Sequence, residues 1–301
     1  MDFDDLYQRG LSLEKLRAFL AVVRAGSVTG AAGGEGSRRS LMSRQIGELE
    51  KALGIELFQR RGKTLRVTDA GRELALLTAT CFNELGSFVE RANRGESNLR
   101  IGAGASVFEA VVFPHMRQIR AAFGKSRFEF VTNNTTGTLR SLHEGELDIG
   151  IVRAGGYGTD LVVNPCGSME FVLVGRLDFD RNLPEWGIGT FLDRVPLAII
   201  RGEGQFVSAF QRLCNEMDVS PQIVMRTESF GHVRQLLLAG HPGGILPKPL
   251  AADLSPSEFH TLYDPELRRL SRDLVVVIDS RVARLNDRLA ATAEKLAGIL
   301  L

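Results

Sequence analysis

Apolar and polar positions recur with a helical period through the N-terminal third of the chain. The clearest example begins at Ser37, where intervals of four, three and four define one apolar face: Met42, Ile46, Leu49 and Leu53. At ~100° per residue, burial of this face turns a polar set outward: Ser40, Ser43, Arg44, Gly47 and Lys51. Gly54 follows as a left-handed residue that ends the helix. The pattern predicts an amphipathic helix whose exposed face carries hydroxyl and cationic groups.

The segments on either side of this helix predict a small helical domain with a basic hairpin. Upstream, an amphipathic stretch at 16–23 ends before Ser27, which caps a second helix. Three glycines within 33–36 cost about 1 kcal/mol each against alanine in a helix, so the second helix is expected to be short. Downstream, two short extended segments flank Arg61-Gly62-Lys63, a pattern that predicts a β-hairpin with a basic turn. Together these elements predict a winged helix-turn-helix, with its third helix in a DNA major groove and its wing against phosphates.

The segment 68–93 predicts a long helix whose apolar stripe needs a partner. Thr68 caps the helix, and Asp69 stands in its first turn. Six residues recur at spacings of four and three: Ala70, Leu74, Leu77, Cys81, Leu85 and Phe88. Because a single helix cannot bury this stripe, we expect it to pair with a second copy of the chain. Cys81 lies in the stripe, where a packing role is expected.

Beyond Ser97, short β-rich runs alternate with helical stretches. Strands are expected at 99–105, 128–131, 147–152, 171–174, 197–200, 223–225 and 274–278. Helices are expected near 107–123, 137–144, 205–217, 229–240 and 281–300. This alternation is typical of open, mostly parallel α/β sheets. Its length fits either one large sheet or two small ones.

Charge is unevenly distributed along the chain. The formal net charge is +1, yet residues 1–94 carry +3 and the remainder carries −2. Within 36–72, nine basic residues stand against four acidic ones. This local excess falls on the predicted helix and hairpin, which favours a polyanionic partner such as double-stranded DNA.

Composition and motif content exclude several classes of protein. Apolar residues make up 44% and charged residues 24%, as in an ordinary globular chain. No run of ~18 apolar residues predicts a membrane span, and the acidic N-terminus is unlike a secretory signal, so a cytoplasmic protein is expected. The three cysteines and five histidines are scattered, and Cys166 and Cys214 fit inert packing better than a redox switch. Val107 breaks the dinucleotide pattern begun by Gly102 and Gly104. We therefore expect no catalytic residue, no metal, no cofactor and no enzymatic activity.

Residues 27–72 resemble the N-terminal domain of the LysR-type transcriptional regulators. The matching elements are Ser27, Ala31-Ala32, Leu41-Met42-Ser43-Arg44-Gln45-Ile46, Leu49-Glu50, Leu53-Gly54, Leu57-Phe58-Gln59-Arg60 and Thr68-Asp69-Ala70-Gly71. Three later segments resemble landmarks of the family's effector domain: Leu99-Arg100-Ile101-Gly102, Gly145-Glu146-Leu147-Asp148-Ile149-Gly150-Ile151, and Leu238-Ala239-Gly240 with Ile245-Leu246-Pro247. The glycines at 33–36, Arg38-Arg39 and His241-Pro242 depart from the family pattern.

This resemblance implies an α/β fold class with three parts. A winged helix-turn-helix DNA-binding domain is expected at 1–66, a dimerising linker helix at 67–96, and a periplasmic-binding-protein-like effector domain at 97–301. Within the effector domain, subdomain I is expected at 97–167 and 271–301, and subdomain II at 168–270. A small effector would bind between these subdomains, as it does in the family.

The candidate DNA-binding residues come from the exposed helix face and the basic hairpin. Arg44 reaches a guanine edge or a phosphate, although a salt bridge to Glu48 one turn on is the structural alternative. Phosphate roles are expected at the helix start and in the wing, where Arg66 is a further candidate. The full set is Ser27, Arg38, Arg39, Ser40, Ser43, Arg44, Arg60, Arg61 and Lys63.

The candidate effector-binding residues follow the carboxyl ends of predicted strands, where ligands of open α/β sheets bind. Hydroxyls and arginines beside helix N-termini suit a carboxylate effector. Capping of those helices is the alternative role for the hydroxyls, and surface ion pairs are the alternative for the arginines. The set is Ser106, Thr135, Thr136, Arg153, Arg201 and Gly202.

We expect a sequence-specific DNA-binding regulator whose DNA binding is modulated by a small organic anion. It should be a homodimer through Leu74, Leu77, Cys81, Leu85 and Phe88 of the long helix, and a tetramer through its effector domains. Two alternatives remain open at this point: an architectural DNA-binding protein without an effector, and a small-molecule-binding or enzymatic α/β protein.

Overall fold

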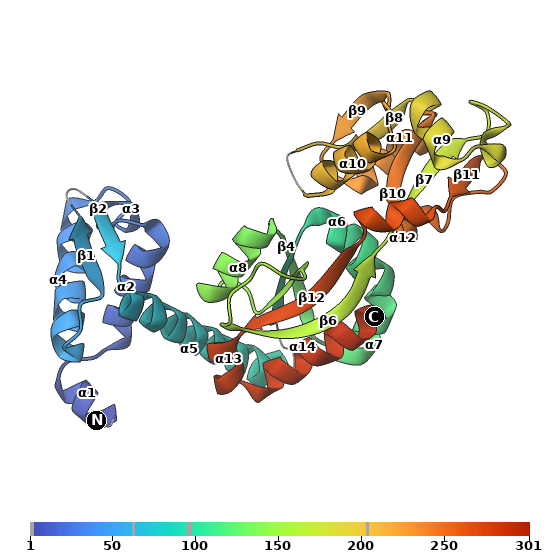
Figure 1. Cartoon of the computed structure of the whole chain (residues 1–301). Helices are drawn as coiled ribbons and strands as arrows, with labels where there is room; N and C mark the ends of the chain where they lie inside the picture. The colour runs from blue at the N-terminus through green and yellow to red at the C-terminus, as the bar shows by residue number, and fades with distance from the viewer. Residues whose placement is uncertain (1–2, 62–63, 95–97, 203–204) are drawn as a thin grey trace. The chain divides into compact units, whose positions relative to one another are not determined.

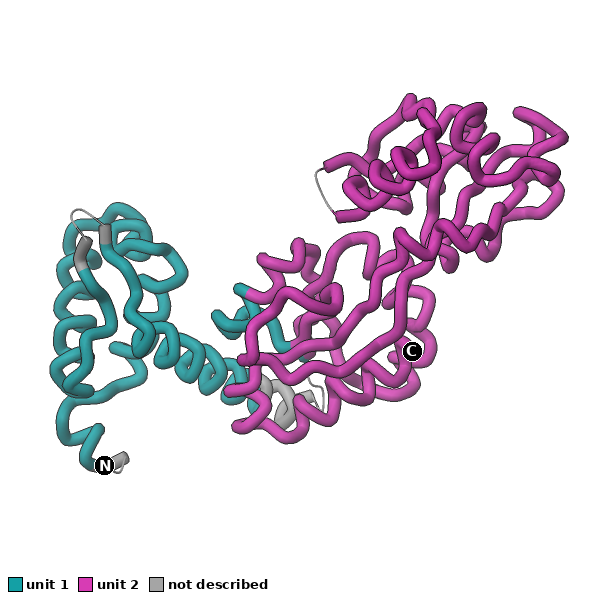
Figure 2. Tube along the Cα trace, viewed as in Figure 1, with its two compact units in different colours: residues 1–98, 140–148 teal, residues 99–139, 149–301 magenta. Residues whose placement is uncertain are grey.

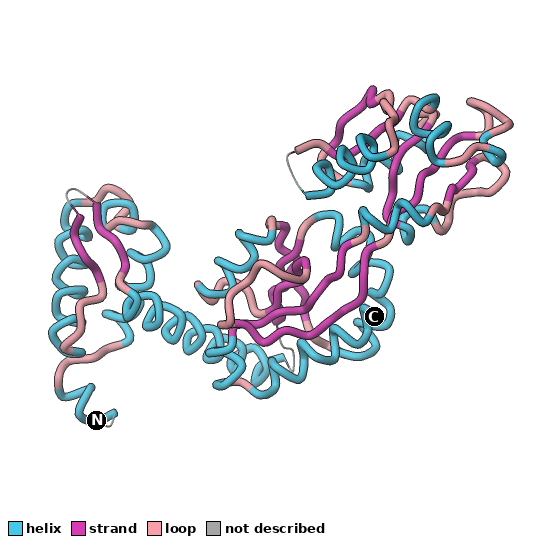
Figure 3. Tube along the Cα trace, in the orientation of Figure 1, coloured by secondary structure: helices cyan, strands magenta, loops and turns pink. Residues whose placement is uncertain are grey.

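The computed structural model describes residues 3–61, 64–94, 98–202 and 205–301. Its contacts divide the chain into two compact units (Figure 2). The first unit holds residues 1–98 together with 140–148, and the second holds 99–139 and 149–301. Figure 3 shows a mainly helical first unit and a second unit in which helices flank two sheets.

The first unit begins with a winged helix-turn-helix. Its elements are α1 (Phe3–Gln8), α2 (Leu13–Ala25), α3 (Val28–Ala31), α4 (Gly36–Leu53), and the antiparallel hairpin of β1 (Phe58–Arg61) and β2 (Thr64–Val67). Phe19 of α2, Leu49 of α4 and Leu57 lie together in its core. Helix α4 begins one position before the predicted start, and Gly54 ends it at φ +69°. The predicted helix–short helix–helix–hairpin order is therefore confirmed.

Local chemistry explains why α3 has only four residues. Ser27 caps it by accepting a hydrogen bond from the Gly30 amide at 3.0 Å. Gly33 and Gly34 then adopt φ +64° and +87°, a region that glycine enters without the steric cost that other residues meet there. The glycine run thus ends the helix at once and turns the chain into α4.

The long helix α5 (Asp69–Arg94) follows the hairpin. Thr68 caps it by accepting a hydrogen bond from the Gly71 amide at 2.9 Å. Ala75, Leu76 and Ala79 form its buried face. Further along α5, the Asn83 side-chain amide donates to the Gly145 carbonyl at 2.8 Å, so the segment 140–148 packs on this helix.

The first five-stranded sheet has the strand order β4-β3-β5-β12-β6. Its strands are β3 (Asn98–Ala103), β4 (Arg127–Thr132), β5 (Ile149–Arg153), β6 (Leu161–Met169) and β12 (Arg272–Asp279). The associated helices are α6 (Ala105–Val107), η1 (Phe108–Val112, a π-helix), η2 (Phe113–His115), α7 (Met116–Phe123), α8 (Thr135–His143), α13 (Ser280–Leu285) and α14 (Asp287–Leu300). Helix α14 packs along β6 and β12 (Figure 1).

The second five-stranded sheet has the strand order β11-β7-β10-β8-β9. Its strands are β7 (Phe171–Arg176), β8 (Leu197–Ile200), β9 (Ile223–Thr227), β10 (Gly243–Pro247) and β11 (Phe259–Leu262). Its helices are η3 (Leu183–Glu185), α9 (Ile188–Arg194), α10 (Gln205–Glu216), α11 (Phe230–Leu238), α12 (Lys248–Ala251) and η4 (Pro265–Leu270).

The expectation of mostly parallel sheets is wrong, because both sheets are mixed. Pairs β3–β5, β8–β9 and β8–β10 are parallel, whereas β12 is antiparallel to both β5 and β6, and β7 is antiparallel to both β10 and β11. The chain leaves the first sheet by β6 and returns to it by β12, so strands of opposite direction lie side by side. The sequence patterns missed β6 and β10, which prolines and glycines interrupt, and β11, which has only four residues.

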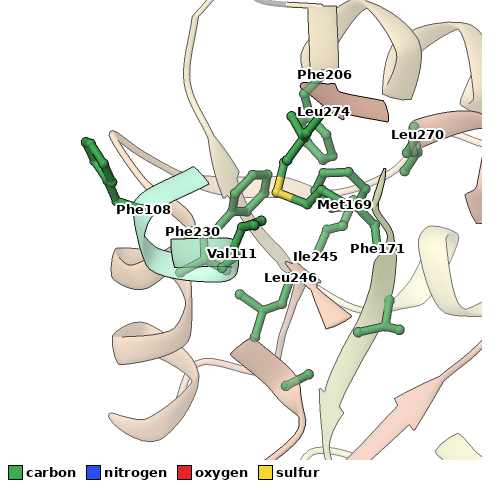
Figure 4. Packing of buried hydrophobic residues seen from close by; sticks show 14 of the residues in the cluster. Phe108, Val111, Met169, Phe171, Phe206, Phe230, Ile245, Leu246, Leu270 and Leu274 are labelled. Carbon is green, nitrogen blue, oxygen red and sulfur yellow. The ribbon is translucent and has the colours of Figure 1, made fainter. Parts of the chain in front are cut away.

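Aromatic side chains of the second sheet and its helices pack around Met169, the last residue of β6, where the chain passes from the first sheet to the second. Phe171 lies 4.9 Å from Phe206 and 5.3 Å from Phe230, measured between ring centroids. Figure 4 shows Met169 among these rings. All four side chains are buried in one continuous core, which fixes the crossover between the sheets.

Candidate DNA interface and effector site

The outer face of α4 presents the predicted polar set. Met42, Ile46 and Leu49 are buried, as the spacing predicts. The opposite face is exposed at Ser40, Ser43, Arg44, Gly47 and Lys51. The Ser40 hydroxyl donates to the Gly36 carbonyl at 3.1 Å, and the Arg44 side chain is 74% exposed. The helix therefore offers one hydroxyl- and cation-bearing surface on the side opposite its buried stripe.

Arg44 takes part in a small ion network at the surface. Its Nε lies 3.3 Å from Glu48 Oε1, so the salt bridge considered as its structural alternative is present. Lys15 Nζ lies 3.1 Å from the other oxygen of the same carboxylate. Exposed pairs of this kind contribute about 0–1 kcal/mol, so the guanidinium can exchange Glu48 for a nucleic-acid acceptor with little loss of stability.

The other described DNA candidates belong to α4 itself, to α3 and to the hairpin. Arg38 and Arg39 are exposed in its first turns, and Arg66 is exposed on β2. Ser27 holds the N-cap of α3. The backbones of Arg60 and Arg61 lie in β1, while their side chains and the whole of Lys63 lie outside the described residues.

The predicted dimerisation stripe on α5 is largely uncovered. Leu85 is 50% exposed and Phe88 is 62% exposed, and Leu77 and Cys81 are also exposed. Leu74, at the start of the stripe, instead packs against the core of the winged helix-turn-helix. The helix thus buries one face within the first unit and leaves a second apolar face open.

The predicted effector residues of the first sheet lie beyond the carboxyl ends of its strands. Ser106 is half-buried in α6 after β3, Thr135 and Thr136 are exposed at the start of α8 after β4, and Arg153 is exposed at the end of β5. Strands β3 and β5 are parallel, and the Asn133 amide donates to the Ala103 carbonyl at 3.0 Å, so these loops share one edge of the sheet.

The capping alternative does not account for these hydroxyls. Gly104 is the N-cap of α6 and has no side chain to offer. Before α8, Asn134 provides the cap, because its side-chain oxygen accepts from the Gly137 amide at 2.7 Å. The hydroxyls of Ser106 and Thr135 are therefore not needed to satisfy either helix start.

In the second sheet, Arg201 and Gly202 follow β8. Arg201 forms an ion pair with Glu228, which is the alternative role considered for it. Both side chains are more than half exposed, so this pair also contributes little. Gly202 adopts φ +111°, a conformation that glycine enters readily.

One polar link between the two effector sheets was missed by sequence analysis. Glu109 of η1, from the first sheet, accepts a hydrogen bond from the Gly231 amide in the first turn of α11 at 2.9 Å. A carboxylate is favoured at a helix N-terminus, and a Cβ at Gly231 would lie 2.8 Å from Glu109 Oε1. No sequence pattern predicts this contact, because Glu109 and Gly231 are isolated residues far apart in the chain.

The described part of the chain offers no reactive buried thiol, no metal site and no membrane-spanning helix. Cys166 and Cys214 are buried, and burial raises the pKa of these thiols to about 12 and about 11, which suppresses the reactive thiolate. No group of three His, Cys, Asp or Glu side chains is arranged there to hold a metal ion. None of its helices combines the length and apolarity that crossing a membrane requires.

Two family profiles match the chain. Residues 13–72 match the bacterial regulatory helix-turn-helix protein, lysR family, and residues 92–293 match the LysR substrate binding domain. The regulator ClcR of Pseudomonas putida is 25% identical over 249 residues, the match covering 80% of this chain and 84% of ClcR. BenM of Acinetobacter baylyi is 30% identical, but that match covers only 48% of each protein. Among solved structures, ArgP of Mycobacterium tuberculosis has a TM-score of 0.66 at 20% identity, covering 94% of this chain and 96% of ArgP.

Fold and profiles together define a DNA-binding regulator with a separate effector-binding domain. The chain belongs to the LysR family of transcriptional regulators. Several curated relatives match over only about half of their length, whereas the similarity in fold to ArgP spans nearly the whole chain. The fold class expected from the sequence, a winged helix-turn-helix, a linker helix and two α/β subdomains, is confirmed.

Proposed function

We propose that the exposed face of α4 reads a DNA major groove while the β1–β2 hairpin contacts the phosphate backbone. The observation that carries this proposal is the division of α4 into a buried stripe at Met42, Ile46 and Leu49 and an exposed stripe at Ser40, Ser43 and Arg44. Arginine forms paired hydrogen bonds with guanine, and serine accepts or donates to bases and phosphates. Arg38 and Arg39 supply charge beside the groove.

The first test replaces Arg44 with alanine. Loss of one base-edge contact is expected to weaken binding to a preferred DNA by about 1–3 kcal/mol, or roughly 5- to 150-fold, while folding and oligomeric state are unchanged. Binding is measured by gel shift on a duplex that the parent protein selects from random-sequence DNA. Arg17→Ala removes another exposed arginine, on α2, and serves as the control. Equal affinity of parent and Arg44→Ala would contradict the proposal.

We also propose that a small organic anion binds at the sheet edge formed by the loops after β3, β4 and β5. Ser106, Thr135 and Thr136 supply hydroxyls there, and Arg153 supplies a cation. A ligand that contacts both subdomains favours one relative arrangement of them, and this preference alters DNA binding. Arg201 and Gly202 are proposed for the same role from the second sheet.

The second test combines Ser106→Ala with Thr135→Ala. Because neither hydroxyl caps its helix, the double variant is expected to fold as the parent does and to keep basal DNA affinity. Changes in DNA affinity caused by acetate or benzoate are expected to disappear. The affinity of parent and variant for the selected duplex is measured with and without each anion. A response equal to that of the parent would place the effector elsewhere.

We further propose the domain boundaries 1–66, 67–96 and 97–301, with a homodimer formed through α5 and a tetramer through the effector domains. Subdomain I would comprise 97–167 and 271–301, and subdomain II 168–270. The uncovered Leu77, Leu85 and Phe88 support the dimer. We propose in addition that the chain acts in the cytoplasm as a regulator without enzymatic activity.

A further inference from the structure

An arginine outside the predicted set lies at the same sheet edge as Arg153. Strands β5 and β12 are antiparallel with Leu274 opposite Arg153, so the start of β12 meets the end of β5. The pairing continues one step further, since the Ala154 amide donates to the Asp273 carbonyl at 2.8 Å. Arg272, the first residue of β12, therefore lies beside the carboxyl end of β5. Arg153 and Arg272 are together called the edge arginines.

Arg272 also reaches an element of the second sheet. Its Cζ lies 5.6 Å from the centroid of the Phe206 ring, in the first turn of α10. Phe206 belongs to the buried aromatic group that surrounds the crossover between the sheets. The guanidinium therefore lies where the two subdomains meet.

No carboxylate among the described residues neutralises the charge of Arg272. Its Nη2 is buried and has no hydrogen-bond partner there, and neither edge arginine forms an ion pair with a described carboxylate. Burial, followed by the positive charge of Arg153, lowers the pKa of Arg272 to about 10. A partly buried cation without a carboxylate partner is unfavourable, so a counter-charge from a ligand would stabilise Arg272.

Other partly buried arginines of the effector domain are neutralised within the chain. The pairs are Arg176–Asp178, Arg234–Asp253 and Arg281–Asp279. The edge arginines differ from this pattern, and they lie next to each other although like charges repel. A ligand carboxylate bound beside both guanidinium groups would offset the repulsion between them.

We propose that Arg272, acting with Arg153, binds the carboxylate group of the effector. This inference rests on the proposed effector function and adds the residue that anchors the anion. A guanidinium suits this role because its planar fork donates two parallel hydrogen bonds to a carboxylate. Because Arg272 begins β12 and contacts α10, an anion bound there touches the crossover at which the two subdomains can reorient.

The experiment measures thermal unfolding of the full chain in acetate, benzoate or sulfate, with ionic strength held constant by sodium chloride. At least one of these anions is expected to raise the unfolding midpoint of the parent. Arg272→Met keeps the aliphatic stem and removes the charge, so its midpoint without anion should equal or exceed that of the parent, and the anion should no longer raise it. Arg272→Lys should keep part of the rise. Arg194→Met, which removes an arginine stacked on Trp186 in the second subdomain, should respond as the parent does.

Two results would overturn the proposal. They are an anion-dependent rise in Arg272→Met as large as that of the parent, whatever its starting midpoint, and no rise in the parent with any of the three anions. If Arg272→Met does not fold, the exposed Arg153→Met takes its place, and a rise equal to that of the parent again contradicts the proposal.

DNA affinity measured in the same anions separates this inference from the proposed function. If the rise depends on Arg272 but DNA affinity never responds to anions, the anion site stands and the effector role fails. If DNA affinity responds equally in the parent and in Arg272→Met, the effector role stands and the assignment of Arg272 fails.

Discussion

Leu85→Asp is expected to abolish the proposed homodimer and, with it, high-affinity DNA binding. Leu85 lies half exposed between Leu77 and Phe88 on the open face of α5. In a symmetric dimer the substitution would place a carboxylate in the interface from each protomer, and an unpaired buried charge costs several kcal/mol. A loss of about 2.7 kcal/mol already raises the dimer Kd about 100-fold, and a larger effect is expected here.

Sedimentation of parent and variant across a range of concentrations measures this effect directly. Gly86→Asp provides a matched control, because Gly86 is the next residue, is exposed, and a Cβ added to it would meet no neighbouring atom within 4 Å. It lies ~100° around the helix from Leu85, outside the apolar stripe. Leu85→Asp protein that sediments as the parent does would show that α5 is not the dimer interface.

The DNA-binding domain could be predicted from the sequence because the features that define it depend on residues close together in the chain. Three buried residues of α4 at helical spacing fix which side faces outward, and Gly33 and Gly34 fix the end of α3. Each of these features depends on a few neighbouring residues, so no long-range contact was needed to predict them.

Less of the effector domain could be predicted, because its proposed anion site depends on contacts between segments far apart in the sequence. Arg272 stands beside Arg153 only through the antiparallel register of β12 and β5, which no sequence period reveals. The link from Glu109 to Gly231 likewise joins two subdomains. Near α8, the run Asn133-Asn134-Thr135-Thr136 offers several possible caps, and only the folded backbone selects Asn134.

Gly145 lies at a second point where distant segments meet, here the linker helix and the segment 140–148. It follows α8 with φ +67°, and its amide donates to the Leu142 carbonyl at 3.1 Å, which closes the helix end. A Cβ at this position would lie 2.7 Å from the Ala79 Cβ on α5. Two features therefore favour glycine at position 145: its left-handed backbone conformation and the close approach of α5. The family landmark that begins at Gly145 thus has a physical reason in this chain.

Gly145→Ala is expected to loosen the packing of 140–148 on α5. Left-handed strain of about 1–2 kcal/mol adds to an overpacking cost of about 1–3 kcal/mol, so a total of about 2–5 kcal/mol is expected in the free energy of unfolding of this region. Gly26→Ala is the matched control, since Gly26 has φ +66° and nothing within 4 Å, and it should show the strain alone. Hydrogen exchange of the amides in 140–148, with denaturant unfolding of the full chain, measures both effects.

The contact at Gly145 also offers a route by which the effector domain can influence DNA binding. The Asn83–Gly145 hydrogen bond ties the end of α8 to the helix proposed to pair the protomers, while the start of α8 carries Thr135. A shift of α8 caused by an anion at Thr135 would be transmitted to α5 through this contact. Gly145→Ala should therefore retain anion-dependent thermal stabilisation while its DNA affinity responds less to the anion. Equal destabilisation by Gly145→Ala and Gly26→Ala would contradict the close packing at Gly145. An undiminished response of DNA affinity to the anion would exclude this route.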